Sequence, residues 1–454
     1  MLKIYNTLKK EEQVFTPIEP GKVRMYSCGP TVYNYAHIGN LRSYVFADIL
    51  KRTLQYENLE VKHVINITDV GHLVSDGDDG DDKMTKALKR EGLPMTIEAM
   101  KSVALKYEAA FIEDLQKLNI KLPDQFPRAT DHIAEDIEII NELESKGFVY
   151  KTGDGLYFDT SKDGNYGTLG GLSDENVARV ETNSEKKSPR DFALWKFNDE
   201  LGWDTPWGKG FPGWHIECSG MSMKYLGEHF DIHTGGIDHI PIHHNNEIAQ
   251  SENATGKQYV NYWLHNAFLN VDNQKISKSL GNDIYLRTLE EKGFSAIDYR
   301  YLLLQANYRY PINFTWESLE ASQTALKKLK NVFLELGTDE GVINHAYTKR
   351  FMEEMDKNLN TPQALAILWQ LVKDEDMLLA DKKATLLDFD KVLGLGMDTW
   401  TRDEIPDEVL VLARERNTAR LSKDWTKSDT LRDQITKLGY EILDKGEDFE
   451  IRKI

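Results

Sequence analysis

Alternating apolar and polar positions near the start of the chain predict a strand, a helix and a second strand. Val23 and Met25 stand between polar neighbours in the stretch from Lys22 to Ser27, as in a half-buried strand. Helical spacing then extends from Asn40 to about Tyr56, with apolar positions at Leu41, Val45, Ile49 and Leu54. The apolar run Val61 to Ile67 follows. We expect a right-handed parallel crossover, which is the first half of a nucleotide-binding sheet.

Further along the chain, the pattern predicts helices, an insertion and a return to sheet. Apolar stripes indicate helices from Thr96 to Leu118 and from His132 to Leu143, and a β-hairpin is expected from Phe148 to Phe158. Residues from about 120 to 204 are interpreted as an insertion between two halves of one sheet. The second half is expected at Phe230–His233, a helix from about His243 to Thr255, Tyr259–Leu264 and Ala267–Val271.

The last third of the chain is predicted to be helical. Thr361 and Pro362 indicate a helix start, with the Thr361 hydroxyl as the cap and proline in the first turn. After a linker, Asp407 is expected to cap a helix that carries three basic residues on one side, namely Arg416, Arg420 and Lys423. The following helix is expected to end at Gly439.

Composition places the chain among ordinary globular proteins, with 40% hydrophobic and 29% charged residues. The first residues lack the pattern of a signal peptide, and no apolar run approaches the roughly 20 residues that span a bilayer. Two cysteines, Cys28 and Cys218, are too few for a disulfide framework. We therefore expect a cytoplasmic protein that does not associate with membranes.

The formal net charge of -18 argues against a protein that coats nucleic acid indiscriminately, because phosphate binding relies on Lys and Arg. A local basic face can still serve one specific RNA. The acidic stretch from Asp76 to Asp82 does not fit a calcium-binding EF-hand, since Gly80 and Ala87 fall where oxygen ligands are required. We interpret it as a solvated loop.

The stretch from Cys28 to Asn40 is a strand-to-helix turn that is expected to face a ligand. A helix N-terminus offers unpaired backbone N–H groups and partial positive charge. Gly39 lets a phosphate approach the backbone, and His37 adds a donor at the same edge. Thr68 follows the second strand, at the carboxyl edge where open parallel sheets bind ligands.

Four residues form a candidate zinc site. His243 and Glu247 are four apart on a predicted helix, so both side chains project from one face. Cys28 and Cys218 would add thiolates from the ends of strands or turns. The alternative is that each cysteine is a small buried hydrophobe and that the His–Glu pair is solvated. The adjacent His244 leaves the choice of histidine open.

A second phosphate-binding element is the sequence Lys275-Ile-Ser-Lys278-Ser. Two lysines on a loop after a strand can bring mobile positive charge to a polyphosphate. The same sequence is equally compatible with a solvated surface loop.

Taken together, these motifs resemble those of class I aminoacyl-tRNA synthetases, and among them cysteinyl-tRNA synthetases. The resemblance rests on Cys-Gly-Pro-Thr-Val-Tyr with His-Ile-Gly-Asn, Gly-Trp-His-Ile-Glu-Cys, Gly-Gly-Ile-Asp followed by His-His-Asn-Asn-Glu-Ile-Ala-Gln-Ser, and Lys-Ile-Ser-Lys-Ser. It continues through Asn360-Thr-Pro and covers essentially the whole chain. Modest departures are Asn40 for a histidine, Ile276 for a methionine and Asn245 for a glutamate.

The resemblance implies a role for each matching residue. Zinc, one ion per chain, would be bound by Cys28, Cys218, His243 and Glu247. Catalytic residues would be His37, Asn40, Lys275 and Lys278, and ATP would contact His37, Gly39, Asn40, Asp238 and Lys278. Cysteine would lie near Gly29, Thr68 and Trp214. Contacts with tRNA would come from Arg416, Arg420, Lys423 and Trp425.

The implied fold is α/β, with a Rossmann-like parallel-sheet catalytic domain split by an insertion and followed by an α-helical region that ends in a small anticodon-binding domain. The expected boundaries are 1–119 and 205–293 for the catalytic halves, 120–204 for the insertion, 294–395 for a helical bundle and 396–454 for the anticodon-binding domain.

The implied reaction is activation of L-cysteine by ATP with Mg²⁺, then transfer to the 3′ end of tRNA(Cys) by a monomeric enzyme. Zinc would distinguish cysteine from serine, because a metal favours a thiolate over a hydroxyl where pocket size alone discriminates poorly. Four protein ligands would close a tetrahedral site, so Glu247 is expected to be the weakest or most distant ligand.

Two other interpretations compete. A cysteine ligase of the mycothiol-pathway type shares this catalytic core but joins cysteine to an amino sugar and lacks a tRNA-binding C-terminus. The alternative of a non-catalytic zinc and RNA-binding paralogue is disfavoured by the intact His37, Lys275 and Lys278. The basic residues after 396 favour tRNA, although they are equally compatible with a solvated helix face.

Overall fold

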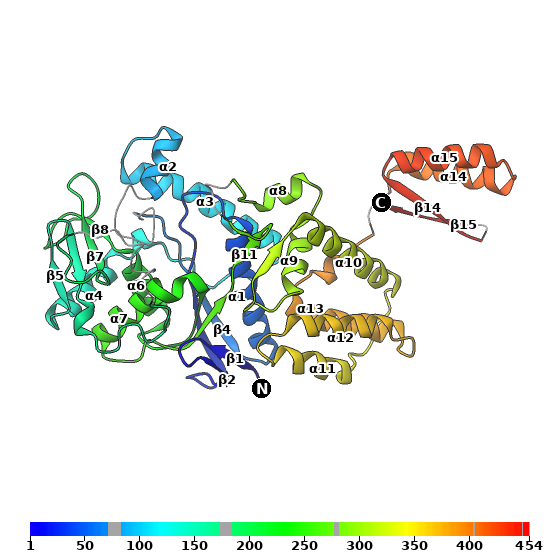
Figure 1. Ribbon diagram of the computed structural model, residues 1–454. Helices are drawn as coiled ribbons and strands as arrows, with labels where there is room; N and C mark the ends of the chain where they lie inside the picture. Colours follow the sequence, from blue (N-terminus) through cyan, green and yellow to red (C-terminus); the bar gives the residue numbers. More distant parts are fainter. Residues whose placement is uncertain (71–82, 173–183, 277–280, 403–404, 447, 454) are drawn as a thin grey trace. The chain divides into compact units, whose positions relative to one another are not determined.

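The computed structural model describes residues 1–70, 83–172, 184–276, 281–402, 405–446 and 448–453. It divides into two compact units, Met1–Met397 and Asp398–Ile454, which are considered separately below (Figure 1). The acidic stretch from Asp76 to Asp82 and the proposed catalytic Lys278 lie outside the described residues.

A four-stranded parallel sheet, in the order β10-β9-β3-β4, forms the centre of the first unit. Its strands are β3 (Lys22–Ser27), β4 (Glu60–Ile65), β9 (Phe230–Gly236) and β10 (Val260–Asn266). Helix α1 (Ile38–Tyr56) connects β3 to the parallel β4, so the predicted strand–helix–strand unit is confirmed. Its second strand ends at Ile65 rather than Ile67.

The strand order of this sheet reverses between β3 and β9, while all four strands remain parallel. The connection from β3 leads to β4 on one side, whereas the connection from β9 leads to β10 on the other. Open α/β sheets bind ligands at the carboxyl ends of such strands, where the diverging connections leave a crevice. Cys28 directly follows β3, and Asp238 lies in the short turn Ile237–His239 that follows β9.

Between β4 and β9 the chain forms helices and an antiparallel sheet. The helices are α2 (Lys83–Glu91), α3 (Ile97–Lys117), α4 (Ile133–Ser145) and α6 (Trp214–Leu226). The sheet contains β5 (Val149–Lys151), β6 (Gly155–Phe158), β7 (Phe192–Phe197) and β8 (Gly210–Pro212). The hairpin of β5 and β6 was predicted, and the sheet extends beyond residue 204 through β8.

The rest of the first unit contains two small sheets, with strand orders β1-β2 and β12-β11-β13, and a set of helices. The strands are β1 (Lys3–Asn6), β2 (Glu11–Val14), β11 (Leu269–Val271), β12 (Gln274–Lys275) and β13 (Ile312–Phe314). The helices are α7 (Asn245–Thr255), α8 (Leu286–Glu291), α9 (Ala296–Leu304), α10 (Trp316–Glu335), α11 (His345–Met355), α12 (Thr361–Lys373) and α13 (Leu379–Leu393). Within the described ranges, no helix is both long and apolar enough to cross a membrane.

A buried ion-pair network anchors α1 to the helical part of the first unit. Arg300 of α9 is fully buried and donates to Asp48 of α1 at 2.6 Å, to the Leu393 carbonyl at 2.8 Å and to the Leu118 carbonyl at 3.0 Å. Arg52 donates to the same Asp48 carboxylate at 2.8 Å. The helix that bears the phosphate-binding motif at its start is therefore fixed at its other end.

The second unit packs two helices on a hairpin, in α14 (Asp407–Leu421), α15 (Trp425–Lys437), β14 (Tyr440–Lys445) and β15 (Asp448–Lys453). Its core includes Val409, Ala413, Ile435, Tyr440 and Ile442. The predicted helix end is confirmed, because α15 is followed by Gly439 at φ +84°.

Two predicted helix caps are wrong by one residue. The residue that caps α12 is Asn360, and Thr361 is already the first helical residue. Likewise Pro406 precedes α14, so Asp407 lies inside the first turn, where its charge favours the helix dipole. In both cases the preceding residue, whose backbone is not helical, takes the flanking position.

Candidate active site and metal centre

A pocket of about 440 Å³ opens where β3 and β9 end. One end is lined by Cys28, Trp214 and His239, and the other by Gly39, Asn40 and Lys275. The segment Ala267–Leu269, which leads from β10 into β11, closes one side. Residues more than 200 positions apart in the sequence thus share one cavity.

The phosphate-binding motif occupies the start of α1. His37 is the N-cap, and its Nδ1 accepts a hydrogen bond from the Asn40 backbone N–H at 3.2 Å. Asn40 in turn accepts from the His37 backbone N–H at 3.3 Å, which completes a capping box. Because Nδ1 is the acceptor, the neutral ring carries its proton on Nε2, which is a hydrogen-bond donor.

Gly29 has no room for a side chain. Its backbone N–H donates to Asn66 Oδ1 at 2.7 Å, and a Cβ at this position would lie 1.5 Å from the Asn66 carbonyl oxygen. Thr68 is buried and exchanges backbone hydrogen bonds with Pro30 and Val32, at 3.1 and 3.0 Å. Thr68 therefore supports the pocket wall, while Gly29 and Trp214 line the pocket directly.

Four potential metal-ligand atoms, from Cys28, Cys218, His243 and Glu247, lie within 4.8 Å of one another. Cys28 follows β3, but Cys218 lies in the second turn of α6 rather than at the end of a strand. His243 belongs to a π-helical turn, Ile240–His244, that precedes α7, so the helix expected from His243 begins at Asn245. The spacing of four still directs both side chains to one point.

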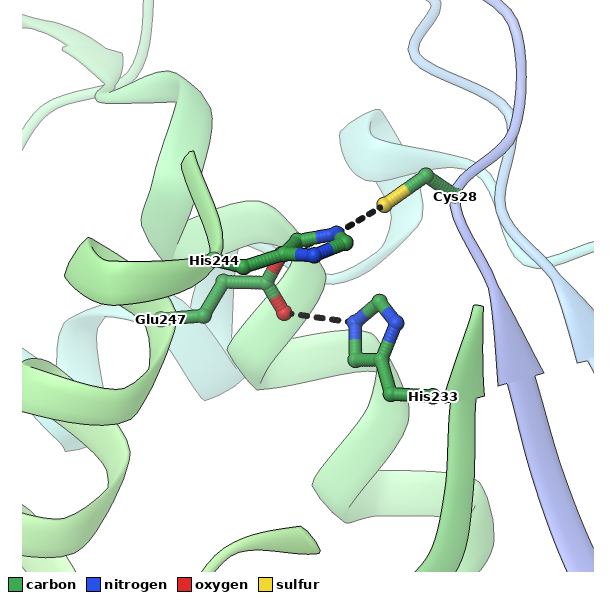
Figure 2. A group of neighbouring side chains, drawn as sticks. All are labelled: Cys28, His233, His244 and Glu247. Carbon is green, nitrogen blue, oxygen red and sulfur yellow. Dashed lines mark hydrogen bonds and ion pairs between the residues drawn. The ribbon is translucent and has the colours of Figure 1, made fainter. Parts of the chain in front are cut away.

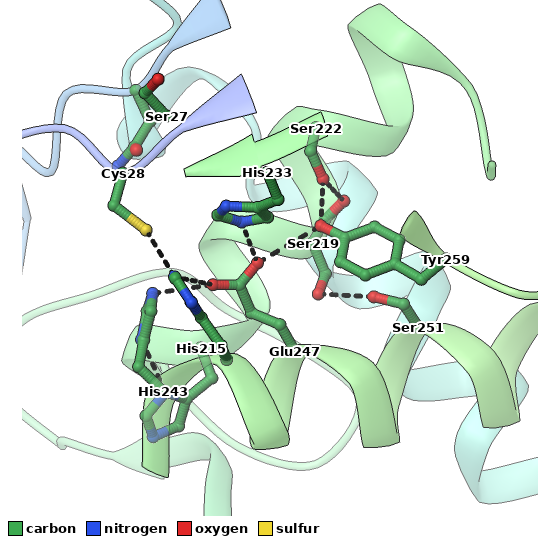
Figure 3. Close-up of polar contacts among 12 residues, drawn as sticks. Ser27, Cys28, His215, Ser219, Ser222, His233, His243, Glu247, Ser251 and Tyr259 are labelled. Atoms are coloured by element: carbon green, nitrogen blue, oxygen red, sulfur yellow. Dashed lines mark hydrogen bonds and ion pairs between the residues drawn. The ribbon is translucent and has the colours of Figure 1, made fainter. Parts of the chain in front are cut away.

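The His243–Glu247 pair is close enough for an ion pair, but its atoms are not aligned for a hydrogen bond. His243 Nε2 and Glu247 Oε1 are 2.9 Å apart, and both side chains are almost completely buried (Figure 3). Yet neither atom has a hydrogen-bond partner among the described residues. Buried polar atoms are nearly always satisfied, so a cation that both atoms can approach accounts for this arrangement.

A second group of potential ligands overlaps the first. Cys28, His233, His244 and Glu247 also have donor atoms within 4.8 Å of one another (Figure 2). Here the contacts are ordinary hydrogen bonds, with Cys28 Sγ 3.2 Å from His244 Nε2 and His233 Nε2 2.9 Å from Glu247 Oε2. His244 and His233 are therefore satisfied without a metal.

Additional histidines, which the sequence motifs did not single out, surround the cluster. His215 Nδ1 lies 2.8 Å from His243 Nδ1 (Figure 3), and His244 Nδ1 lies 2.8 Å from His265 Nε2. His215 belongs to α6, His233 to β9 and His265 to β10. The sequence feature that points to His233 and His265 is their position near the ends of parallel strands. Tyr259 adds a hydrogen bond to Glu247 Oε2 at 3.3 Å.

The pKa values of the two thiols are shifted in opposite directions. The hydrogen bond from Cys28 lowers the pKa of Cys218 to about 6, whereas burial raises the pKa of Cys28 well above its usual value. Burial opposes protonation of His243, but Glu247 and Cys218 together raise its pKa to about 10. These shifts favour a thiolate at Cys218 and a positive charge at His243, beside the Glu247 carboxylate.

Of the expected ATP-binding and catalytic residues, Gly39 and Lys275 lie around the other end of the pocket. Lys275 is exposed at the end of β12, and its Nζ lies 4.7 Å from the centre of the Phe268 ring. Asp238 is exposed and lines the pocket next to His239, on the side of Cys28. Gly39 faces Ile276, whose Cδ1 would lie 2.9 Å from a Cβ at this glycine.

The four residues expected to contact tRNA do not share one exposed face. Arg416 is buried and forms an ion pair with Asp444, and Arg420 Nε lies 3.4 Å from the same carboxylate. Lys423 lies outside α14, which ends at Leu421, and has a left-handed φ of 61°. Trp425 is 59% exposed at the start of α15.

Comparisons with known proteins agree over nearly the whole chain. The family described as class I (C) tRNA synthetase catalytic domain matches residues 14–324. A protein named cysteine–tRNA ligase 1 from Burkholderia lata is 48% identical over 98% of this chain and 96% of its own length. The cysteine–tRNA ligase of Treponema denticola is 43% identical, with 98% of each chain covered.

Solved structures support the fold. Mycobacterium tuberculosis methionyl-tRNA synthetase in complex with methionyl-adenylate superimposes with a TM-score of 0.57 at 16% identity, covering 82% of this chain and 90% of the other. The Agrobacterium radiobacter agnB2 LeuRS, in a ternary complex with tRNA and LeuAMS, gives a TM-score of 0.59 at 11% identity, covering 85% of each chain. With these relatives at high identity over nearly full length, the chain belongs to the cysteine–tRNA ligase family of class I tRNA synthetases.

Proposed function

We propose that this chain is an ATP-dependent ligase that activates L-cysteine to cysteinyl-adenylate and transfers the cysteinyl group to the 3′ end of tRNA(Cys). One observation supports this above all others. A single pocket joins a thiol-rich candidate metal centre, at the Cys28 end, to a helix N-terminus and a lysine suited to polyphosphate, at the Asn40 end. An amino acid bound by its sulfur would then present its carboxylate toward ATP.

We assign zinc to Cys28, Cys218, His243 and Glu247. Two sulfurs, one imidazole nitrogen and one carboxylate oxygen are ligands that zinc prefers, and the unsatisfied His243 Nε2 and Glu247 Oε1 fit a cation between them. The alternative set with His233 and His244 contains one sulfur, and its nitrogens already have partners. Bound zinc would supply selectivity for the thiolate of cysteine over the hydroxyl of serine.

In the first step, the cysteine carboxylate oxygen attacks the α-phosphorus of ATP, a P–O bond forms, and pyrophosphate leaves with the electrons of the broken P–O bond. His37 Nε2–H and the partial positive charge at the start of α1 stabilise the added negative charge on phosphate oxygens. Lys275, which also lines the pocket, donates to the same phosphates, and Asp238 is assigned to the nucleoside end of ATP. Magnesium accompanies ATP as counter-ion.

In the second step, a hydroxyl of the terminal adenosine attacks the cysteinyl carbonyl carbon, and AMP leaves. No protein nucleophile takes part, so the chain contributes positioning and charge. Gly29 and Trp214 border the amino-acid end, and the Trp214 ring lies 4.2 Å, centre to centre, from His243. Thr68 supports this wall through its backbone bonds.

We place the activity in a reducing compartment such as the cytoplasm, because both cysteines are free and both belong to the candidate metal site. Action as a monomer stays a prediction.

The decisive experiment is charging of a tRNA(Cys) transcript with labelled cysteine, with serine in parallel, together with cysteine-dependent pyrophosphate exchange and the zinc content of the purified protein. We expect charging with cysteine only, and one zinc per chain. Pyrophosphate exchange without charging would instead favour the amino-sugar ligase. Zinc and RNA binding without exchange would favour the non-catalytic paralogue.

A matched pair of lysine variants tests the assignment at the ATP end. Lys275→Ala is expected to slow pyrophosphate exchange by about 100-fold, as for loss of one transition-state contact, without changing zinc content. Lys257→Ala removes an exposed lysine that pairs with Glu228 and does not line the pocket. It should behave like the parent chain, and equal activity of both variants would contradict the role of Lys275.

A further inference from the structure

A cluster of cationic and aromatic side chains borders the pocket on the side of the Tyr33–Tyr35 loop. We call this cluster the basic rim. It joins the loop to helices α2, α3 and α8, and it consists of Tyr35, Lys86, Lys89, Arg90, Lys106, Tyr107 and Arg287. Of these, only Tyr35 is among the described residues that line the pocket.

Helix α2 presents a positive face in a chain whose net charge is -18. Its buried side carries Met84, Ala87 and Leu88, and its exposed residues Lys86, Lys89 and Arg90 all carry positive charge. A local reversal of sign on an acidic protein attracts a polyanion to that place and repels it elsewhere. The amino-acid and ATP ends of the pocket do not include these residues, so the activation step leaves them without a role.

The positive face is tied to the pocket by Arg90. Its Nη2 donates to the Tyr33 carbonyl at 2.8 Å and to the Tyr107 hydroxyl at 2.9 Å, yet its side chain remains 45% exposed. The exposed Lys106 lies beside the same Tyr107 ring, 5.0 Å from its centre. The half-buried Glu91 carboxylate pairs with Arg90 at 3.4 Å and with Lys106 at 3.2 Å, so Lys86 and Lys89 of α2 supply the remaining positive charge of this face. A polyanionic chain bound along these cations therefore reaches the loop that contains Tyr33 and Tyr35.

Arg287 and Tyr35 form a planar surface next to this path. The Arg287 guanidinium carbon lies 4.1 Å from the centre of the Tyr35 ring, and Tyr107 meets the same ring edge-on at 5.1 Å. Arg287 is exposed, which leaves the stack accessible. Aromatic rings and guanidinium planes are the surfaces on which proteins stack unpaired bases, and nearby cations hold the connecting phosphates.

We propose that the basic rim binds the single-stranded 3′ end of the tRNA, with a base stacked on the Arg287–Tyr35 pair and phosphates on Lys86, Lys89 and Arg90. The proposal rests on the proposed function, because the reacting hydroxyl of the third substrate must enter this pocket. With cysteine at the Cys28 end and ATP at the Asn40 end, the Tyr33–Tyr35 side is the border where cations and stacking surfaces coincide.

The test is a double-mutant cycle between protein and RNA. Binding is measured for a complete tRNA(Cys) transcript and for one that lacks its last four nucleotides. Arg287→Ala is expected to weaken binding of the complete transcript about tenfold, as for the loss of one stacked base, and to leave binding of the shortened one unchanged. A double charge reversal, Lys86→Glu with Lys89→Glu, should lower the slope of log K against log salt by about 1.4, or about 0.7 per phosphate contact.

Arg309→Ala is the matched control. Arg309 makes the same kind of stack, 3.3 Å from the centre of the Tyr5 ring, but neither residue lines the pocket. Its removal should affect the two transcripts equally. Thermal unfolding of each variant checks that the fold is intact.

Equal weakening of both transcripts by Arg287→Ala would overturn the proposal, and so would binding that is unchanged in both variants of the rim. A parallel loss of cysteine-dependent pyrophosphate exchange in Arg287→Ala would also overturn it, since the residue would then serve activation. If the parent chain lacks that exchange altogether, the proposed function fails, whereas the binding cycle still decides whether the rim holds an RNA end.

Discussion

The orientation of His243 depends on His215, and removal of His215 should weaken zinc binding without removing a ligand. The two Nδ1 atoms are 2.8 Å apart, and both rings are buried. If His243 binds the metal through Nε2, its Nδ1 carries the proton and donates to His215. His215→Ala therefore leaves a buried N–H without its acceptor and frees the ring to rotate.

The size of the effect follows from that lost bond. A buried donor that loses its partner costs about 1–3 kcal/mol. Since 1.4 kcal/mol is a factor of ten in an equilibrium constant, zinc affinity should fall about 5- to 150-fold. Loss of the groups that orient metal-binding histidines elsewhere costs about 10- to 100-fold in affinity, in agreement with this range.

Competition with a chromophoric chelator measures the affinity. His215→Asn places an amide oxygen close to the position of Nδ1 and should recover much of the loss, because the acceptor is restored. His229→Ala is the control, since His229 contacts Asn261 at 2.8 Å and takes no part in the cluster. Zinc affinity of His215→Ala equal to that of the parent would refute the assigned hydrogen bond and its role.

Three further changes test other parts of the structure. Arg300→Ala should lower the free energy of unfolding in urea by about 3–5 kcal/mol, because it leaves the buried Asp48 charge with one fewer partner; a loss below 1 kcal/mol would contradict the network. Burial raises the pKa of Asp114 to about 7, so its carboxyl group is neutral in the folded state at low pH and reduces stability as the pH rises toward 7. Asp114→Asn should thus stabilise the chain more at pH 8 than at pH 4, and an equal gain at both would refute the shift. Arg416→Ala should lower the melting temperature with little effect on RNA contacts, whereas Trp425→Ala should weaken tRNA charging, by up to about tenfold, and spare the melting temperature; the reverse pattern would restore Arg416 as an RNA contact.

The sequence predicted best those elements whose stability is local or strongly periodic. The crossover of β3, α1 and β4 was predicted because apolar positions at spacings of two and then about 3.6 leave few alternatives. The hairpin of β5 and β6 and the helix end at Gly439 depend on turn and end signals that lie within a few residues. The proximity of Cys28 to Cys218, by contrast, was expected only from the hypothesis of a shared zinc site and from the family resemblance, since no local pattern relates residues 190 positions apart.

Features that depend on distant partners were missed or misplaced. Arg416 looked like part of an exposed basic face, but Asp444 of the hairpin neutralises it, and such an ion pair is not visible in helical spacing. The capping role of Asn40 required the actual dihedral angles of His37. His215, His233 and His265 reach the cluster from α6, β9 and β10, so only the sheet topology brings them together.

The pairing of β3 with β9 has a consequence for synthesis of the chain. These neighbours are separated by roughly 200 residues, so β3 leaves the ribosome long before its partner exists. At about 5–20 residues per second, one edge of β3 stays open for about 10–40 s. During that interval the buried side chains of Tyr26 and Met25 are exposed together with an unpaired strand edge, which is a template for aggregation. The nascent chain should therefore depend on chaperones most strongly before β9 emerges from the ribosome. A fragment that ends before Phe230 should aggregate.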